Sequence, residues 1–184
     1  MLRSALMTLL VMWLCPGHTR AAEPSVSPQV GLPAPDFTLR RLDGAPIQLA
    51  TLREQGPVVV LVLRGYPGYQ CPICNRQVGQ FLTKADQFAA AQANVVMIYP
   101  GPAAGLQAHA AEFVTGKTLP DRFHLLLDPD YNFTIAYGLR WDAPNETAYP
   151  STFVVDQSGV IKFAKISRTH GDRSSVAEVL AVLQ

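Results

Sequence analysis

Two cysteines three positions apart, Cys71 and Cys74, are the residues of this 184-residue chain best suited to carry out chemistry. They lie in the stretch RGYPGYQCPICNRQ (64–77), separated by Pro72 and Ile73. Such a pair can exchange electrons with other thiols and disulfides, reduce peroxides, bind a metal ion or form a structural crosslink. By the chain-entropy account, a disulfide that closes so short a loop adds little stability. The spacing therefore favours a reactive pair over a structural one.

The residues on either side of the pair predict a strand, a tight loop and a helix. PVVVLVLR (57–64) is a continuous run rich in β-branched residues, typical of a central strand buried on both faces. Residues 72–93 contain no proline after Pro72, and their apolar side chains recur at roughly helical spacing. Because Pro72 suits the first turn of a helix, Cys71 falls at or beside the N-cap. A helix N-terminus carries about half a positive charge, which favours the thiolate form of Cys71.

Two arginines close to the pair, Arg64 and Arg76, could add positive charge to it. For Arg76 we expect an ordinary surface position. A CxxC that opens a helix after a buried strand is a fairly strong indication of redox chemistry.

The remaining sequence predicts alternating strands and helices that end in a hairpin and a helix. A β-hairpin is expected over 36–49, with its turn at Asp43-Gly44. The further elements expected are helices at 50–56, 103–115, 131–139 and 174–183, strands at 94–100 and 123–128, and a hairpin of strands 151–156 and 160–166. Parallel strands joined by helices and finished by a hairpin and a helix predict a three-layer α/β/α sandwich.

The first 21 residues predict a cleaved secretory signal peptide. Arg3 precedes a ten-residue apolar run (6–15) that is too short to span a bilayer, and small residues favour cleavage near Ala21 or Ala22. Cys15 leaves with this segment. Residues 22–34, rich in proline and serine, form an extended lead-in, and 35–184 form one domain.

Composition and charge restrict the partners and the compartment. Hydrophobic residues make up 48% of the chain and charged residues 16%, as in a globular protein, and the formal net charge is +1. We expect neither nucleic-acid binding nor a stable membrane anchor. A signal peptide predicts a secreted protein, in the bacterial periplasm, where a dithiol forms a reversible disulfide unless it is actively reduced.

Four stretches in this order resemble thioredoxin-fold redoxins. They are APDFTL (34–39), the strand-loop-CPIC-helix unit, LLLDPDYNFTIAYGL (125–139) and YPSTFVVDQSGVI (149–161). More narrowly, the chain is similar, from about residue 30 to its end, to the peroxiredoxin-like family of alkyl hydroperoxide reductase and thiol-specific antioxidant proteins. The resemblance implies a thioredoxin-like sandwich with an N-terminal β-hairpin extension. It also implies an oxidoreductase with antioxidant activity and no cofactor, acting on a protein thiol or disulfide or on a hydroperoxide, with an undefined electron donor.

Within this superfamily, the thioredoxin-like proteins share the CxxC and a proline that faces it, usually in cis, just before a strand. Pro150 occupies the corresponding position here. The resemblance implies a cis Pro150 that leaves a backbone edge free to pair with a substrate chain. Cys71 would attack a substrate disulfide and Cys74 would resolve the mixed disulfide.

Peroxiredoxins instead carry a proline, a hydroxyl residue four positions later and the peroxidatic cysteine three positions beyond that. In this alignment Pro67 matches, Cys71 replaces the hydroxyl residue and Cys74 is the peroxidatic cysteine, resolved by Cys71. The family's arginine before the strand at 151–156 is replaced by Pro150, and Arg140 is a possible substitute. The loss of both the hydroxyl residue and the arginine counts against fast peroxide reduction.

Two further residues are expected to bind substrate or tune the thiolate. They are Tyr69, on the loop before the CxxC, and Thr152, next to Pro150. A third function is copper delivery, in which Cys71 and Cys74 and a distant histidine, His170, would bind Cu(I). We expect a secreted thiol-disulfide oxidoreductase, with the peroxidase as the first alternative and the copper chaperone as the second.

Overall fold

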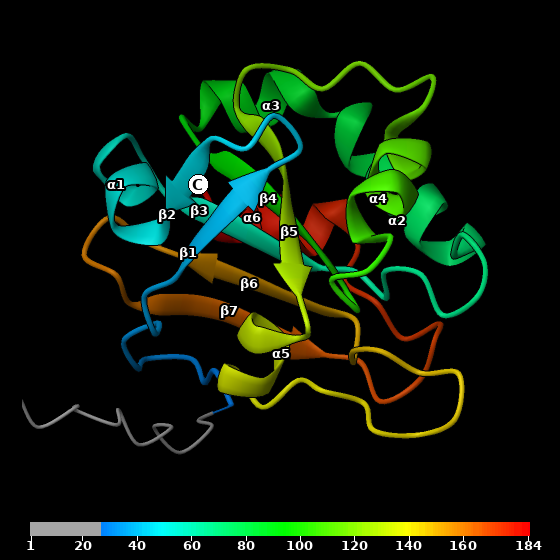
Figure 1. The fold of residues 1–184 in the computed structure, drawn as a ribbon. Coiled ribbons are helices and arrows are strands. Elements are labelled where there is room, and N and C mark those ends of the chain that lie inside the picture. Colours follow the sequence, from blue (N-terminus) through cyan, green and yellow to red (C-terminus); the bar gives the residue numbers. More distant parts are fainter. Residues whose placement is uncertain (1–26) are drawn as a thin grey trace, which may run out of the picture.

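The computed structural model describes residues 27–184, which build one seven-stranded mixed sheet with helices on both faces (Figure 1). The predicted signal peptide, its cleavage site and Cys15 lie outside the described residues. The strands are β1 (Thr38–Arg41), β2 (Pro46–Gln48), β3 (Val58–Val62), β4 (Asn94–Gly101), β5 (Phe123–Pro129), β6 (Ser151–Val155) and β7 (Ile161–Ile166). The helices are α1 (Leu49–Glu54), α2 (Pro72–Leu82), α3 (Ala85–Ala90), α4 (Leu106–Val114), α5 (Asn132–Ala136) and α6 (Val176–Val182).

The sheet has the strand order β2-β1-β5-β4-β3-β6-β7. Strands β3, β4 and β5 are parallel neighbours, whereas β6 runs antiparallel to β3 and β7 antiparallel to β6. The β1–β2 hairpin joins the sheet through an antiparallel pairing of β1 with β5. The predicted three-layer sandwich with an N-terminal hairpin extension is therefore confirmed.

Strand β3 is buried over its whole length because its side chains alternate between two separate hydrophobic clusters. Val59 and Leu61 point into a cluster with residues of α2, α3, α4 and α6. Val58, Val60 and Val62 point into the opposite cluster, which contains residues of α1 and α5. This arrangement explains the uninterrupted apolar run, since neither face of the strand meets solvent.

The single helix predicted over 72–93 is in fact two helices, α2 and α3, so that prediction was wrong. The Thr83 hydroxyl donates to the Gln80 carbonyl (2.8 Å), a local bond that competes with the helical ladder. Lys84 leaves the helical conformation (φ −114°, ψ 18°). The Phe81 and Phe88 rings then stack 5.4 Å apart, which packs α3 back onto α2. Apolar spacing continues across the break, and the sequence pattern therefore did not reveal it.

The chain leaves the carboxyl end of β3 through a loop whose course depends on Gly65. Its φ is +67°, and a Cβ there would lie 1.8 Å from the Pro100 carbonyl oxygen at the end of β4. Only glycine fits such a close backbone approach at positive φ. Ser151 pairs with Val62, so the start of β6 flanks the same end of β3. No helix within residues 27–184 is long and apolar enough to cross a bilayer.

Candidate active site

Cys71 is the N-cap residue of α2, as predicted. Its extended backbone (φ −67°, ψ 111°) precedes Pro72 at the start of the helix, and its Sγ accepts the Cys74 N–H at 3.4 Å. This contact uses one of the backbone donors that a helix N-terminus leaves without an intrahelical partner. The sulfur therefore lies at the positive end of the helix, where a thiolate is favoured over a thiol.

Cys74 lies one turn further along, with its side chain directed into the core. Its Sγ accepts the Arg64 N–H at 3.4 Å. Both cysteines are free thiols and nearly inaccessible, with 2% exposure for Cys71 and 1% for Cys74. The two sulfurs therefore share one buried polar site at the carboxyl end of β3.

Arg173, on the loop between β7 and α6, brings a guanidinium group to this site. Its Nη2 lies 3.4 Å from Cys74 Sγ and 3.8 Å from Cys71 Sγ. Its Nη1 donates to Gln77 Oε1 (3.0 Å) and its Nε to the His170 carbonyl (2.9 Å), which fixes the side chain. Sequence reasoning missed this residue because 99 positions separate it from Cys74 and no local motif marks it.

The contacts at the two thiols shift their pKa values in opposite directions. The pKa of Cys71 falls to about 5, chiefly because its thiolate accepts a hydrogen bond from the Cys74 side chain, with help from the Cys74 N–H, Arg173 and Arg64. Burial raises the pKa of Cys74, and its hydrogen bond to Cys71 raises it further. At neutral pH the pair therefore holds one thiolate, on Cys71, and one thiol, on Cys74.

Arg64 is almost fully buried, and its guanidinium group points away from the sulfurs toward the loop that follows α5. It donates to the Tyr69 hydroxyl (3.0 Å), the Asn145 carbonyl (3.1 Å) and Glu146 Oε2 (2.8 Å). Its Nε has no hydrogen-bond partner within residues 27–184. The predicted role of Arg64 in thiolate tuning is thus exerted through its backbone N–H on Cys74 and its charge near Cys71.

Glu146 connects Arg64 with the loop that carries Arg173. One carboxylate oxygen accepts from Arg64, and the other lies 2.8 Å from Nε2 of His170. The His170 ring also packs against Trp141, with ring centroids 5.2 Å apart. His170 is therefore directed at Glu146, and no group of three metal-ligating side chains is assembled in the described part of the chain. The described residues therefore do not bring together the three side chains that the copper-binding alternative requires.

Arg140, the predicted substitute for the family arginine, does not reach the sulfurs, and that prediction was wrong. Its Nη1 donates to the backbone carbonyls of Trp141, Glu146 and Thr147. Its guanidinium group also lies over the Tyr131 ring, 4.1 Å from the centroid. Arg140 fixes the chain after α5, and Arg173 supplies the cation at the dithiol instead.

The remaining predicted residues, Pro67, Tyr69 and Thr152, lie on the segments around the dithiol and do not contact the sulfurs in the hydrogen bonds of the structure. Pro67 is half-buried in the loop that leads to Cys71. Tyr69 is 48% exposed at the rim of this loop, with its hydroxyl on Arg64. Thr152 is buried in β6, and its hydroxyl accepts a hydrogen bond from Ser174 (2.6 Å), the residue next to Arg173. Thr152 therefore anchors the loop that carries the guanidinium group.

Pro150 directly precedes β6 at the expected place, but the implied cis bond and free backbone edge are both absent. Residues 27–184 contain no cis peptide bond. The Pro150 carbonyl accepts the Ser167 N–H (2.9 Å), and the Tyr149 N–H donates to the Leu139 carbonyl (2.9 Å). Because Ser167, directly after β7, and Leu139, after α5, already use these groups, the expected pairing with a substrate chain was wrong.

A second group of residues not predicted from sequence holds the loop before Cys71. Gln70 donates to the His109 carbonyl (2.8 Å) and accepts from the Tyr99 hydroxyl (2.9 Å). The Tyr66 ring stacks on His109 with centroids 3.6 Å apart. These contacts fix the loop to β4 and α4. Among these residues, only Tyr66 could have been noticed in the sequence, because it is an aromatic residue close to the CxxC motif.

The fold and the site together define a thioredoxin-fold redoxin with a dithiol centre. The chain belongs to the AhpC/TSA family, whose model matches residues 30–164. This finding confirms the predicted family.

Individual relatives support this assignment. The chain is 32% identical over 141 residues to alkyl hydroperoxide reductase E of Mycobacterium tuberculosis, a match that covers 76% of this chain and 86% of that protein. It is 30% identical over 154 residues to chloroplastic peroxiredoxin Q of Oryza sativa subsp. japonica, covering 84% of this chain. The match spans 66% of the length of the rice protein, just under two thirds.

Solved structures show the same fold. A crystal structure of peroxidoxin BcpB from Mycobacterium tuberculosis superposes with a TM-score of 0.66 at 23% identity, covering 85% of this chain and 96% of that one. The reduced 2-Cys peroxiredoxin of Plasmodium vivax gives a TM-score of 0.65 at 14% identity, covering 84% and 79% of the two chains.

Proposed function

We propose that this protein is a thiol peroxidase of the peroxiredoxin type, which reduces hydroperoxides with the two electrons of Cys71 and Cys74. The observation that carries the proposal is the Arg173 guanidinium group within 3.8 Å of both sulfurs in a chain of the AhpC/TSA family. A guanidinium group beside a buried thiolate lowers the thiol pKa and stabilises the negative charge that leaves with the peroxide oxygen.

The reaction follows from the protonation states of the pair. The Cys71 thiolate attacks one peroxide oxygen, the O–O bond breaks, and the alkoxide or hydroxide leaves and takes up a proton. Cys71 becomes a sulfenic acid. The Cys74 thiol then attacks the sulfenic sulfur, releasing water and forming the Cys71–Cys74 disulfide. An external thiol reductant returns two electrons and restores the dithiol.

The assignment of the attacking sulfur reverses the one that alignment with peroxiredoxins implies. That alignment makes Cys74 peroxidatic, whereas burial and the hydrogen bond to Cys71 raise the pKa of Cys74. The thiolate is the nucleophilic form, and the lowered pKa of Cys71 supports Cys71 in this role. Its N-cap position adds the positive end of α2 to the Arg173 charge.

The backbone around Pro150 favours a peroxidase over a thioredoxin-like protein reductase. Recognition of a protein disulfide by strand pairing needs unpaired backbone groups beside the dithiol. The Pro150 carbonyl and the Tyr149 N–H are both already bonded. A small hydroperoxide needs no such edge.

For the compartment, we propose secretion to the bacterial periplasm. Support comes from the sequence of residues 1–21, with Arg3, the short apolar run and the small residues near Ala21. N-terminal sequencing of the protein recovered from a periplasmic fraction tests it, and an intact Met1 in the cytosolic fraction would refute it.

The test of the peroxidase uses the reduced protein, its matched single variants Cys71→Ser and Cys74→Ser, and one equivalent of hydroperoxide. The wild type is expected to consume the peroxide and form the disulfide. Cys74→Ser is expected to consume it and retain a sulfenic acid that dimedone traps, and Cys71→Ser to lose the reaction. Rapid consumption by Cys71→Ser alone would assign the attack to Cys74. Consumption by the wild type no faster than by a free dithiol, together with rapid reduction of insulin disulfides, would replace the peroxidase with a disulfide reductase.

A further inference from the structure

A polar pocket of about 310 Å³ lies beside the dithiol, between the outer face of α2 and the loop before α6. Ile73, from the centre of the CPIC motif, forms one wall. Two arginines, Arg76 and Arg173, and two glutamines, Gln77 and Gln80, also line it. The pocket therefore shares Arg173 with the two sulfurs.

Neither arginine of this pocket is neutralised by a carboxylate. Arg76 is exposed and makes no hydrogen bond or ion pair with any described residue. Arg173 bonds only to the sulfurs, to the amide of Gln77 and to a backbone carbonyl. The nearest acidic side chains along the chain, Asp172 and Glu178, both pair with Lys165, at 3.3 and 3.6 Å. The pocket is thus positively charged.

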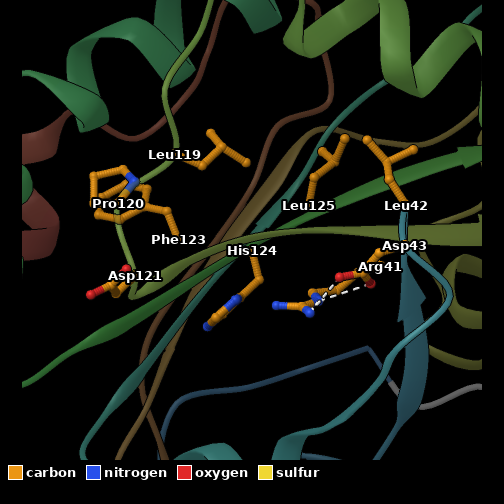
Figure 2. A pocket seen from close by; sticks show the side chains of 9 residues that line it. All are labelled: Arg41, Leu42, Asp43, Leu119, Pro120, Asp121, Phe123, His124 and Leu125. Carbon is orange, nitrogen blue, oxygen red and sulfur yellow. Dashed lines mark hydrogen bonds and ion pairs between the residues drawn. The ribbon is translucent and has the colours of Figure 1, made fainter.

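The cavity at the opposite end of the sheet lacks these properties. It measures about 360 Å³ and lies between the β1–β2 turn and the segment that enters β5 (Figure 2). Figure 2 shows the Arg41 guanidinium group turned to the Asp43 carboxylate, which it meets at 2.5 Å. The pocket at α2 differs in that neither of its arginines pairs with a carboxylate, and one of them, Arg173, also contacts both sulfurs.

We propose that the Arg76–Arg173 pocket binds the carboxylate of a small substrate whose reacting group reaches the dithiol. The Arg76 guanidinium group can offer paired N–H donors, which match the geometry of a carboxylate, and Arg173 adds its positive charge beside it. Arg173 alone would be shared between the thiolate and the bound anion, and Arg76 supplies the second positive charge. The substrate is either a hydroperoxide or a thiol reductant that carries a carboxylate, so this inference rests in part on the proposed peroxidase.

Alkylation of the reduced protein tests the pocket without any peroxidase activity. Iodoacetate and iodoacetamide are similar in size, and in both the thiolate displaces iodide to form a thioether, but only iodoacetate carries a carboxylate. The measured quantity is the ratio of their rate constants, normalised to that of a free dithiol. We expect a ratio above one for the wild type. Arg76→Gln should lower it by up to about 5-fold, as for loss of one exposed ionic contact.

The matched control is Lys84→Gln, which removes one exposed positive charge beyond the far end of α2. It is expected to change the ratio less than 2-fold, since surface charges at that distance are screened. The proposed carboxylate binding would be refuted if Arg76→Gln left the ratio of rate constants unchanged, or if both variants lowered it equally.

Two further comparisons identify the source of the carboxylate. One compares a carboxylate-bearing hydroperoxide with tert-butyl hydroperoxide, and the other compares mercaptoacetate with 2-mercaptoethanol as reductant. If Arg76→Gln loses the preference for the carboxylate-bearing hydroperoxide, the peroxide is the substrate that the pocket binds. If it loses the preference for mercaptoacetate, the reductant is the substrate that the pocket binds. Loss in neither pair overturns the inference. If the wild type consumes no peroxide, the proposed function fails, while the alkylation ratio still decides the pocket.

Discussion

Replacement of Arg173 by glutamine removes the positive charge that lies 3.8 Å from Cys71 Sγ and 3.4 Å from Cys74 Sγ. Glutamine keeps a hydrogen-bond donor of similar polarity, so the change is mainly one of charge. Arg173 is a secondary cause of the low pKa of Cys71, behind the hydrogen bond from Cys74. We therefore expect a partial rise of that pKa.

A hydrogen bond to a charged group contributes about 1.5–3 kcal/mol, and one pKa unit corresponds to about 1.4 kcal/mol. The variant should thus raise the pKa of Cys71 from about 5 to about 6.5. At pH 7 the thiolate fraction falls only from about 99% to about 76%, but at pH 5.5 it falls from about 76% to about 9%. The loss of thiolate is therefore about eightfold at pH 5.5 and minor at pH 7.

The assay is the rate of iodoacetamide alkylation and of peroxide consumption between pH 4 and 9. Both rates should follow the raised pKa, and any additional loss of peroxidase rate at pH 8 measures how far Arg173 stabilises the departing oxygen. Arg168→Gln is the matched control, because Arg168 is exposed on the same loop and lies over the Tyr149 ring. A pH profile of Arg173→Gln that coincides with that of the wild type would refute the role of Arg173.

Three further predictions concern stability. Glu146→Gln should destabilise the protein by about 3 kcal/mol in urea unfolding, because it leaves the buried charge of Arg64 without its carboxylate. Gly65→Ala should lower the melting temperature sharply, since its Cβ would lie 1.8 Å from the Pro100 carbonyl oxygen, whereas Gly44→Ala, at similar φ with no atom within 4 Å, should cost less. The free energy of unfolding of the reduced protein should rise between about pH 5 and 9, because in this range the Cys71 thiol is protonated in the unfolded chain and ionised in the folded one. Cys71→Ser should flatten this rise in urea unfolding measured across the same pH range.

The parts of the site that follow from local sequence could be predicted. The β-branched run before the motif predicts a buried strand, and the absence of proline after Pro72 predicts a helix that opens at the CxxC. These signals are local because strand burial and helix capping depend on neighbouring residues. They placed Cys71 at the N-cap, where the structure has it.

The parts that depend on long-range packing could not be predicted. Arg173 reaches the sulfurs because Ser174 bonds to Thr152 and Gln77 receives the guanidinium group, two contacts between segments far apart in the chain. Arg140 was the more obvious candidate because it precedes the strand that carries the family's arginine. Its guanidinium group is instead taken up by backbone carbonyls of the chain after α5.

Compared with the peroxiredoxin pattern, the positive charge beside the dithiol comes from a different position in the chain. Pro150 stands where the family has an arginine, and that position cannot supply a cation. The guanidinium group comes instead from the loop that follows β7, at the same end of the β6–β7 hairpin as Pro150, where Arg173 meets both sulfurs. A cation shared by two cysteines stabilises whichever sulfur bears the negative charge, in the attack on peroxide and again when the disulfide is reduced. Cys71 in place of the hydroxyl residue and Arg173 in place of the arginine therefore support each other, since the second thiol gives the relocated guanidinium group its second sulfur contact.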